Sequence, residues 1–210
     1  RKPVPKSNLR WRFPDEMRKV IDLEGSAPRL SGHAGMVLPG LTQTEDYMAD
    51  LARRGQPAMP PIQVDKFVAL RLARQRVLDN LDQRFEFVID QAALARMENM
   101  GGSSKIMHDQ IRKLGELADR PNITIRIVPF SYGPYLGQAF TYYLAEYDLE
   151  PGKSAVHLAY IDRYDGLDVL HDDRGVAEYQ MLWGVQRLAG LSPEKSLWFL
   201  QLLTGSPSLS

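Results

Sequence analysis

The chain has 210 residues, of which 44% are hydrophobic and 25% are charged, and its 26 basic residues balance 26 acidic ones. This length allows one large domain or two small ones with a buried core. It contains no cysteine, which excludes disulfides, thiolate catalysis and the usual structural zinc sites. No apolar run approaches the ~20 residues of a membrane span, and the zero net charge argues against broad binding to a phosphate backbone. The composition therefore predicts a cytoplasmic protein without cofactor.

Residues 1–13 carry five basic residues, two prolines and no acidic residue. Such a segment is typical of an extended linker or arm, so we expect it to join the folded part to a domain upstream. The remainder is expected to form a single domain over residues 14–204, followed by a short flexible tail over 205–210.

Hydrophobic periodicity and capping residues predict the elements in chain order. Helices are expected over residues 14–30, from Thr42 or Thr44 to Gly55, and over 64–81, 90–97, 103–118, 173–189 and 192–203. Strands are expected over residues 85–89, 123–130, 139–147 and 154–162, with the last two forming an antiparallel hairpin. The order predicts an α+β fold: a mixed, largely antiparallel sheet of about four strands flanked by N- and C-terminal helices.

Three polar residues interrupt the apolar side of the helix expected over residues 64–81. At about 100° per residue, Arg71, Arg74 and Gln75 fall within the arc of the apolar side chains. A guanidinium there is costly unless a carboxylate or an anionic ligand pairs with it. The simpler interpretation is a buried ion pair, for which Glu45, Asp90 and Asp162 are the candidate partners. The alternative is a bidentate anchor for a phosphate or carboxylate ligand.

The segment FSYGPYLGQ follows a predicted strand and brings Tyr132 and Tyr135 beside two glycines and a proline. Loops of this kind carry ligand sites, so both tyrosines are candidate ligand-binding residues, although an ordinary turn is the simpler interpretation. The four histidines lack the spacing of a metal site, and His171 followed by two aspartates is more simply a helix start. We therefore expect neither a metal nor a catalytic residue.

The helix expected over residues 192–203 contains SLWFLQLL, which is apolar on most sides. A helix of this kind must bury both faces. Either the core encloses it, or Trp198 and Phe199 contact a partner or a second copy of the chain.

Several blocks, taken in order, resemble one family. These are VLPGLTQTEDYM, the R-x-x-RQ-x-x-L spacing from Arg71 to Leu78, FVIDQAALAR, KIMHDQIRKLGELADRPNITIRIVPF and LAGLSPEKSLWFL. They resemble the domain of unknown function at the C-terminal end of actinobacterial Xre-type helix-turn-helix regulators, such as those of Streptomyces development and antibiotic production. The resemblance covers about residues 20–204.

The resemblance implies an effector domain that senses a small molecule or binds a small companion protein, and that contacts DNA only through a domain upstream of this sequence. A second hypothesis is an enzyme, or an enzyme-derived domain, that holds a nucleotide-like anion through Arg71, Arg74 and Gln75, with Asp90 or Asp162 as acid or base. A third is homodimerisation through the terminal helices. No membrane partner is expected.

Overall fold

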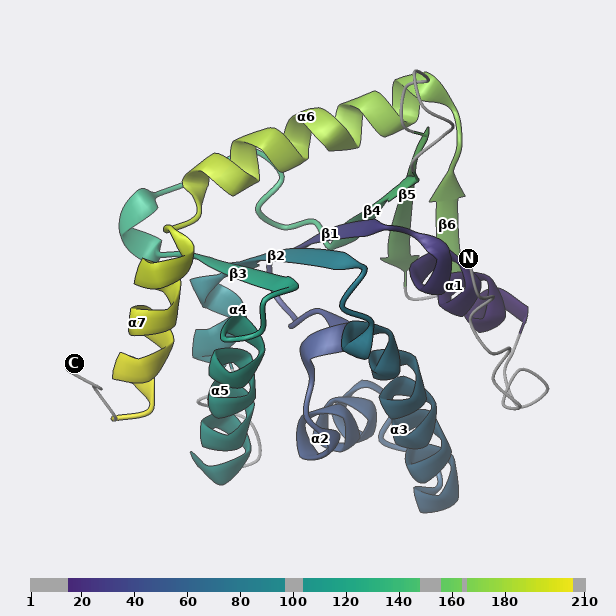
Figure 1. Ribbon diagram of the computed structural model, residues 1–210. Helices are drawn as coiled ribbons and strands as arrows, with labels where there is room; N and C mark the ends of the chain where they lie inside the picture. Colours follow the sequence, from purple (N-terminus) through teal and green to yellow (C-terminus); the bar gives the residue numbers. More distant parts are fainter. Residues whose placement is uncertain (1–14, 97–103, 148–155, 164–165, 206–210) are drawn as a thin grey trace.

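The computed structural model describes residues 15–96, 104–147, 156–163 and 166–205, and all structural statements below concern these residues. They form one sheet with helices on both of its faces (Figure 1). The strands are β1 (Arg29–Ala34), β2 (Arg84–Asp90), β3 (Ile123–Val128), β4 (Tyr142–Tyr147), β5 (Val156–Arg163) and β6 (Gly166–Leu170). The helices are α1 (Asp15–Ser26), α2 (Glu45–Gly55), α3 (Pro61–Gln75), α4 (Gln91–Ala95), α5 (Ser104–Ala118), α6 (Asp173–Ala189) and α7 (Pro193–Leu203).

The sheet has the strand order β3-β2-β1-β4-β5-β6. β1 pairs in parallel with β2, and β2 pairs in parallel with β3. The pairs β1–β4, β4–β5 and β5–β6 are antiparallel. β1 is therefore the strand at which the parallel half of the sheet meets the antiparallel half.

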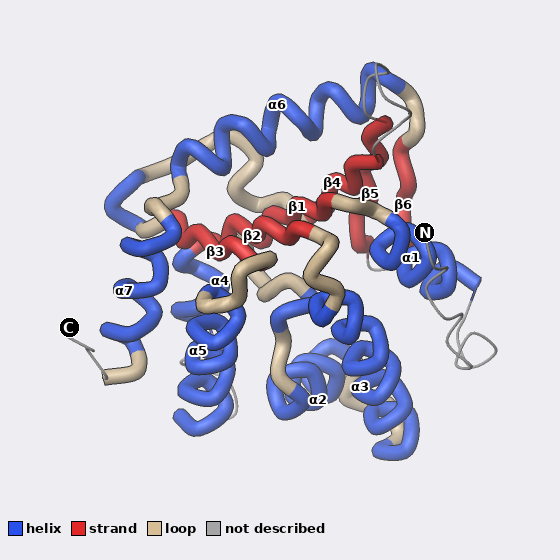
Figure 2. The backbone as a smooth tube through the Cα atoms, in the orientation of Figure 1, coloured by secondary structure: helices blue, strands red, loops and turns tan. Residues whose placement is uncertain are grey.

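The two faces of the sheet are covered differently (Figure 2). Helices α2, α3, α4, α5 and α7 lie on one face, and α6 crosses the other. Alternate residues of β2, Phe85, Phe87 and Ile89, point into the larger core with the helices of the first face. Val88 points to the opposite face, where it packs with Ala189 of α6.

Capping residues begin several helices where the sequence predicts them. The side chain of Thr44 accepts a hydrogen bond from the backbone N–H of Tyr47 at the start of α2. At the start of α4 the Asp90 side chain accepts a hydrogen bond from the backbone N–H of Ala92. At the start of α7 the Ser192 side chain accepts one from the backbone N–H of Lys195. Each side-chain oxygen pairs with one of the N–H groups that a helix start leaves without an internal partner.

The predicted α+β class and the mixed sheet are confirmed, but the sheet has six strands where about four were expected. The predicted helix over residues 14–30 is wrong at its end, because α1 stops at Ser26 and Arg29 already begins β1. Strand β6 was also missed. The predicted helix over 64–81 is two elements, α3 and a 3₁₀ turn over Arg76–Asp79.

The antiparallel pairing of β4 with β5 is confirmed. The connection between them, and residues 1–14 with the expected linker, lie outside the described residues. Among the described helices, none is both long and apolar enough to cross a membrane.

Candidate functional site

Arg74 forms a buried ion pair with Glu24 of α1. Its Nε lies 2.6 Å from Glu24 Oε2, and its Nη2 lies 2.5 Å from Oε1. The Tyr160 hydroxyl donates a further hydrogen bond to Oε1, at 2.5 Å. The side chains of Arg74 and Glu24 are 6% and 1% exposed. The predicted buried ion pair therefore exists, with a carboxylate that sequence reasoning did not single out.

The three carboxylates proposed as partners lie elsewhere. Glu45 is exposed in the first turn of α2. Asp90 caps α4 and accepts a hydrogen bond from Tyr135. Asp162 belongs to β5, and its side chain is outside the described residues. The pairing with Glu24 depends on α1 and α3 meeting, 50 residues apart in the chain.

Electrostatics keep the Arg74 guanidinium charged. Burial by itself lowers the pKa of Arg74, but the charge and hydrogen bonds of Glu24 outweigh it and raise the pKa well above its ordinary value. The pKa of Tyr160 is also raised, first by burial and then by the Glu24 charge. Tyr160 therefore remains a protonated donor to Glu24.

Gln75 holds the turn formed by residues 39–44. Its Nε2 donates to the carbonyl oxygens of Gly40 and Gln43, at 2.9 and 2.8 Å. Its Oε1 accepts a hydrogen bond from Lys113 Nζ of α5 at 2.8 Å. These contacts bind the turn, α3 and α5 together, so Gln75 already uses its amide on groups of the chain.

Arg71 lies on the same side of α3. Its Nη1 donates to Gln43 Oε1 at 3.1 Å, and its guanidinium carbon lies 4.5 Å from the centre of the Phe67 ring. A Cβ on Gly40 would lie 3.2 Å from Arg71 Nη1. The turn thus comes close to the end of the Arg71 side chain. The structure brings Arg71, Arg74 and Gln75 together, as predicted, around this turn.

Lys113 adds a third cation to this cluster, beside Arg71 and Arg74. Its Nζ donates to the Gln43 carbonyl oxygen at 3.0 Å as well as to Gln75. Burial lowers its pKa, and the charge of Glu116 acts in the opposite direction. Lys113 was not predicted as a site residue, because it lies at the edge of the apolar side of α5 and its partners Gln43 and Gln75 are distant in the chain.

Tyr132 and Tyr135 lie away from the arginines, in the loop that follows β3. Tyr132 is 50% exposed. Tyr135 is half-buried, and its hydroxyl donates to Asp90 Oδ2 at 2.6 Å. The two rings meet edge to face, with centroids 6.2 Å apart. The five predicted ligand-binding residues therefore occupy two separate places.

His33, at the carboxyl end of β1, completes a chain of polar groups with Tyr135 and Asp90. Its Nδ1 lies 2.6 Å from the carbonyl oxygen of Phe140, and its Nε2 lies 3.1 Å from the Tyr135 hydroxyl. A carbonyl oxygen can only accept, so Nδ1 carries a proton. Tyr135 has one hydroxyl proton for two neighbours, Asp90 and His33. Protonation of Nε2 would let His33 donate to Tyr135 while Tyr135 donates to Asp90.

The pKa directions in this chain follow from burial. Burial lowers the pKa of His33 and outweighs the Phe140 hydrogen bond and the Asp90 charge, which raise it. Burial and the hydrogen bond to Asp90 raise the pKa of Tyr135. His33 was not predicted as a site residue, because its partners Phe140 and Tyr135 lie 107 and 102 positions away in the chain.

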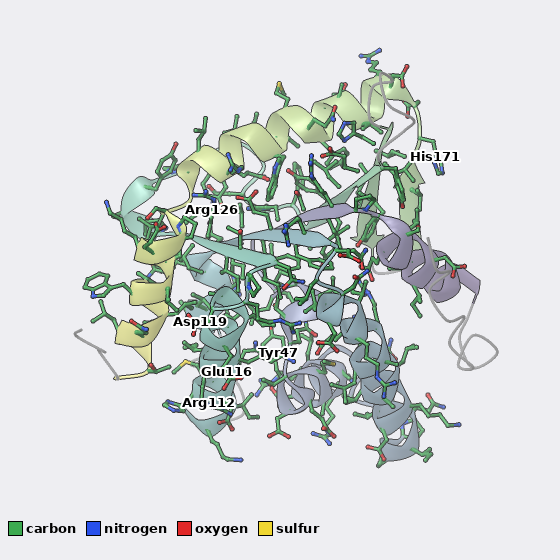
Figure 3. All side chains as sticks on the ribbon, in the orientation of Figure 1. Tyr47, Arg112, Glu116, Asp119, Arg126 and His171 are labelled. Atoms are coloured by element: carbon green, nitrogen blue, oxygen red, sulfur yellow. The ribbon has the colours of Figure 1, made fainter. Side chains whose placement is uncertain are left out.

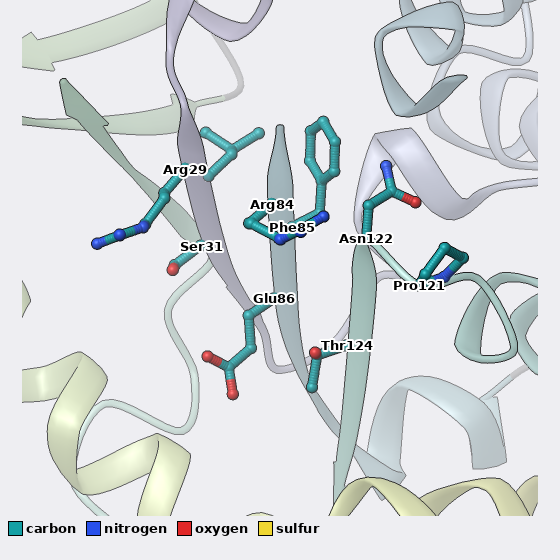
Figure 4. A pocket seen from close by; sticks show the side chains of 9 residues that line it. Arg29, Ser31, Arg84, Phe85, Glu86, Pro121, Asn122 and Thr124 are labelled. Atoms are coloured by element: carbon teal, nitrogen blue, oxygen red, sulfur yellow. The ribbon is translucent and has the colours of Figure 1, made fainter. Parts of the chain in front are cut away.

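A hollow of about 140 Å³ lies at the amino ends of the parallel strands (Figure 4). Its charged residues have partners within the chain. Arg29 Nη1 lies 2.8 Å from Glu146 Oε1, and Glu86 Oε1 lies 2.8 Å from Arg126 Nε. A ligand here would compete with these pairs.

A second hollow, of about 180 Å³, lies between α5 and α7. Arg112 of α5 and Asp119, the residue after α5, line it, and Figure 3 shows them with Glu116 between them. Nearby on α7, Trp198 is 56% exposed, whereas Phe199 packs against the larger core. Of the two residues predicted to form an interface, Trp198 alone presents most of its surface to solvent.

No group of three or more His, Cys, Asp or Glu side chains that could hold a metal ion occurs among the described residues. The sequence feature that most resembled a metal site was His171 followed by two aspartates. In the structure His171 is exposed and lies just before α6.

Comparison with known proteins gives one match. Residues 17–201 match the model of a domain of unknown function, DUF5753. No curated protein and no solved structure gives a significant match. The matched segment takes in both the arginine cluster and the His33–Tyr135–Asp90 chain. The protein therefore belongs to the DUF5753 family.

Proposed function

We propose that this domain is the effector part of a bacterial transcriptional regulator of the Xre type, with a DNA-binding helix-turn-helix domain preceding α1. The observation that carries the proposal is the buried Glu24–Arg74 pair. It ties α1, the helix next to the proposed attachment point, to α3, and Gln75 of α3 holds the turn at residues 39–44. An effector domain acts on an attached domain only through elements that respond to its ligand or partner, and α1 is placed to be such an element.

The proposed input is a small companion protein that binds the loop following β3. Four large side chains of this loop are at least half-exposed: Phe130, Tyr132, Leu136 and Phe140, at 57%, 50%, 57% and 57%. We call them the loop surface. Exposed aromatic and aliphatic side chains are typical of the centre of a protein interface.

A small anionic effector is less well supported. It depended on Arg71, Arg74 and Gln75 being available to a ligand, but Arg74 is paired with Glu24 and Gln75 holds the turn. The enzyme hypothesis relied on the same residues and loses the same support. A regulator of this kind would act in the cytoplasm, in agreement with the absence of cysteine.

The proposal is tested with the full-length protein encoded by the gene, in two measurements. The first is binding to DNA from its own promoter region, at two salt concentrations. We expect specific binding that weakens as salt is raised. The second is a reporter gene under the same promoter in the host cell.

The Leu136→Glu variant should bind promoter DNA like the wild type but should change reporter output. Leu202→Glu, on the exposed side of α7, is the matched control and should behave as the wild type in both assays. A gene with no helix-turn-helix region before this domain would refute the regulator proposal. Wild-type reporter output in Leu136→Glu would refute the loop surface as the input site.

A further inference from the structure

The outer side of α6 carries apolar side chains that face solvent. α6 lies across the sheet (Figure 1), and its inner side packs there with Val176, Leu182 and Trp183. On its outer side Met181 is 59% exposed and Leu188 is 81% exposed. A helix that is apolar on two sides normally buries both of them, so the outer side is expected to have a partner.

Four exposed residues on the outer side of α6 have the same spacing whether the helix is followed from its N-terminus or from its C-terminus. Ala177, Met181, Gly184 and Leu188 are separated by four, three and four positions. At about 100° per residue they fall within about 60° of arc. All four are in the exposed class, and a Cβ on Gly184 would meet nothing within 4 Å. They form one straight strip, which we call the α6 strip.

Large and small residues alternate along the α6 strip in a way that suits a second copy of the same helix. In an antiparallel pair centred between positions 182 and 183, Met181 of one copy faces Gly184 of the other. Leu188 faces Ala177 in the same arrangement. Each large side chain thus meets a small one, which is how helix surfaces interlock, and a two-fold axis makes the surface complementary to itself.

The charges beside the strip do not oppose this approach. Arg174 Nε lies 3.6 Å from Glu178 Oε1 within the same helix. Arg187 Nε lies 2.9 Å from Glu86 Oε1 on β2. Because each cation already has an acidic partner in its own chain, two copies can meet without uncompensated like charges.

We propose that the α6 strip is a homodimer interface in which two copies of α6 pack antiparallel about a two-fold axis. Stable protein interfaces bury about 800 Å² on each partner, and one helix side supplies less. The dimer is therefore weak, and its population depends on protein concentration. The self-matching spacing favours a second copy over an unrelated protein. The outer side of α7 is a less suitable interface, because it begins with the exposed charged residues Glu194 and Lys195.

Engineered cysteines test the geometry directly, because the chain has none of its own. With a rise of 1.5 Å per residue, the two copies of position 184 lie about 4.5 Å apart along the axis. The two copies of position 177 lie about 16 Å apart, beyond the reach of a disulfide. Oxidised Gly184→Cys should therefore form a covalent dimer with itself.

Ala177→Cys alone and Leu188→Cys alone should not cross-link, but a mixture of the two variants should cross-link between them. Cross-linking of all three single variants with themselves would show a parallel pair and would overturn the proposal. Absence of the Gly184→Cys dimer together with absence of the mixed dimer would also overturn it.

Analytical ultracentrifugation of the chain without cysteines gives an independent test. The dimer fraction of the wild type should rise with concentration, and Leu188→Glu should abolish the dimer. Since Leu188 is 81% exposed, this change should leave the melting temperature almost unchanged, which checks that the variant folds. Leu202→Glu is the matched control on α7 and should dimerise like the wild type. A monomer at every concentration, or a dimer lost in Leu202→Glu but kept in Leu188→Glu, would refute the interface.

Discussion

Arg74 and Glu24 lie 50 residues apart in the chain, yet they form two hydrogen bonds, of 2.5 and 2.6 Å, inside the protein. The pair joins α3 to α1, and the Tyr160 hydroxyl extends it to β5. Breaking a buried ion pair leaves a charge without compensation, whereas removing both charges does not. The same pair therefore supports a sharp test of stability.

Glu24→Ala should reduce the free energy of unfolding by about 3–5 kcal/mol, because it leaves the Arg74 guanidinium buried and unpaired. The double variant Glu24→Leu/Arg74→Met should recover most of that loss, since both charges are then gone. Urea denaturation measures both. Glu146→Ala is the control, because its partner Arg29 is 59% exposed and such pairs contribute only about 0–1 kcal/mol. Equal losses in Glu24→Ala and Glu146→Ala would contradict the burial of the pair.

Gln75→Leu should destabilise the protein by about 2 kcal/mol or more, because the carbonyl oxygens of Gly40 and Gln43 and Lys113 Nζ each lose one hydrogen bond. Gln63→Leu, on an exposed position of the same helix, should change the stability by less than about 0.5 kcal/mol. Amide hydrogen exchange should also show faster exchange in the turn at residues 39–44 in the first variant. A Gln75→Leu variant with unchanged exchange there would contradict this account of the turn.

Tyr135→Phe removes the hydroxyl that lies between His33 and Asp90. We expect a loss of about 1–3 kcal/mol, because buried acceptors and donors lose a partner. Tyr132→Phe removes the hydroxyl of the neighbouring tyrosine, which is 50% exposed, and should change the stability little. Thermal unfolding of the two variants side by side distinguishes them, and similar melting temperatures would argue against the polar chain.

Stability should depend on the ionisation of His33. Since burial lowers the pKa of His33 in the folded protein, the unfolded chain binds the proton first, near pH 6.5. The contribution of this group is fully present above that pH. It is lost as the pH falls from about 6.5 toward the folded pKa.

Urea denaturation between about pH 8 and 5.5 should show this fall, and His33→Gln should flatten it. His171→Gln, at an exposed position, is the control and should keep the slope. An NMR titration follows the His33 ring directly. A midpoint at or above pH 6.5 would contradict the lowered pKa.

The elements that depend on local signals could be predicted from the sequence. Thr44, Asp90 and Ser192 are helix caps in the structure, as their positions suggested. The bounds of α6 agree at both ends with the prediction over residues 173–189. Caps and periodicity act within a few residues, so a single sequence contains the information they need.

Strand β1 could not be predicted in this way. Its sequence RLSGHA contains no β-branched or aromatic residue, the types that strands favour, and its conformation comes from pairing with β2 and β4 on both sides. Gly32 is needed there because a Cβ would lie 2.7 Å from the Tyr143 ring of the neighbouring strand. Gly32 is therefore required by a contact with Tyr143, which is distant in the chain. In the sequence alone it cannot be distinguished from a glycine in a turn.

Helical spacing in the sequence is enough to place Arg71, Arg74 and Gln75 on the apolar side of α3 and to require a negative partner for a guanidinium buried there. That this partner is Glu24, and that Gln75 binds the turn at residues 39–44, follows from the packing of distant elements. The same packing places Tyr135 with His33 and Asp90, away from the arginines. The reason is that helical spacing fixes which residues share a side, whereas the partner depends on how elements distant in the chain pack together.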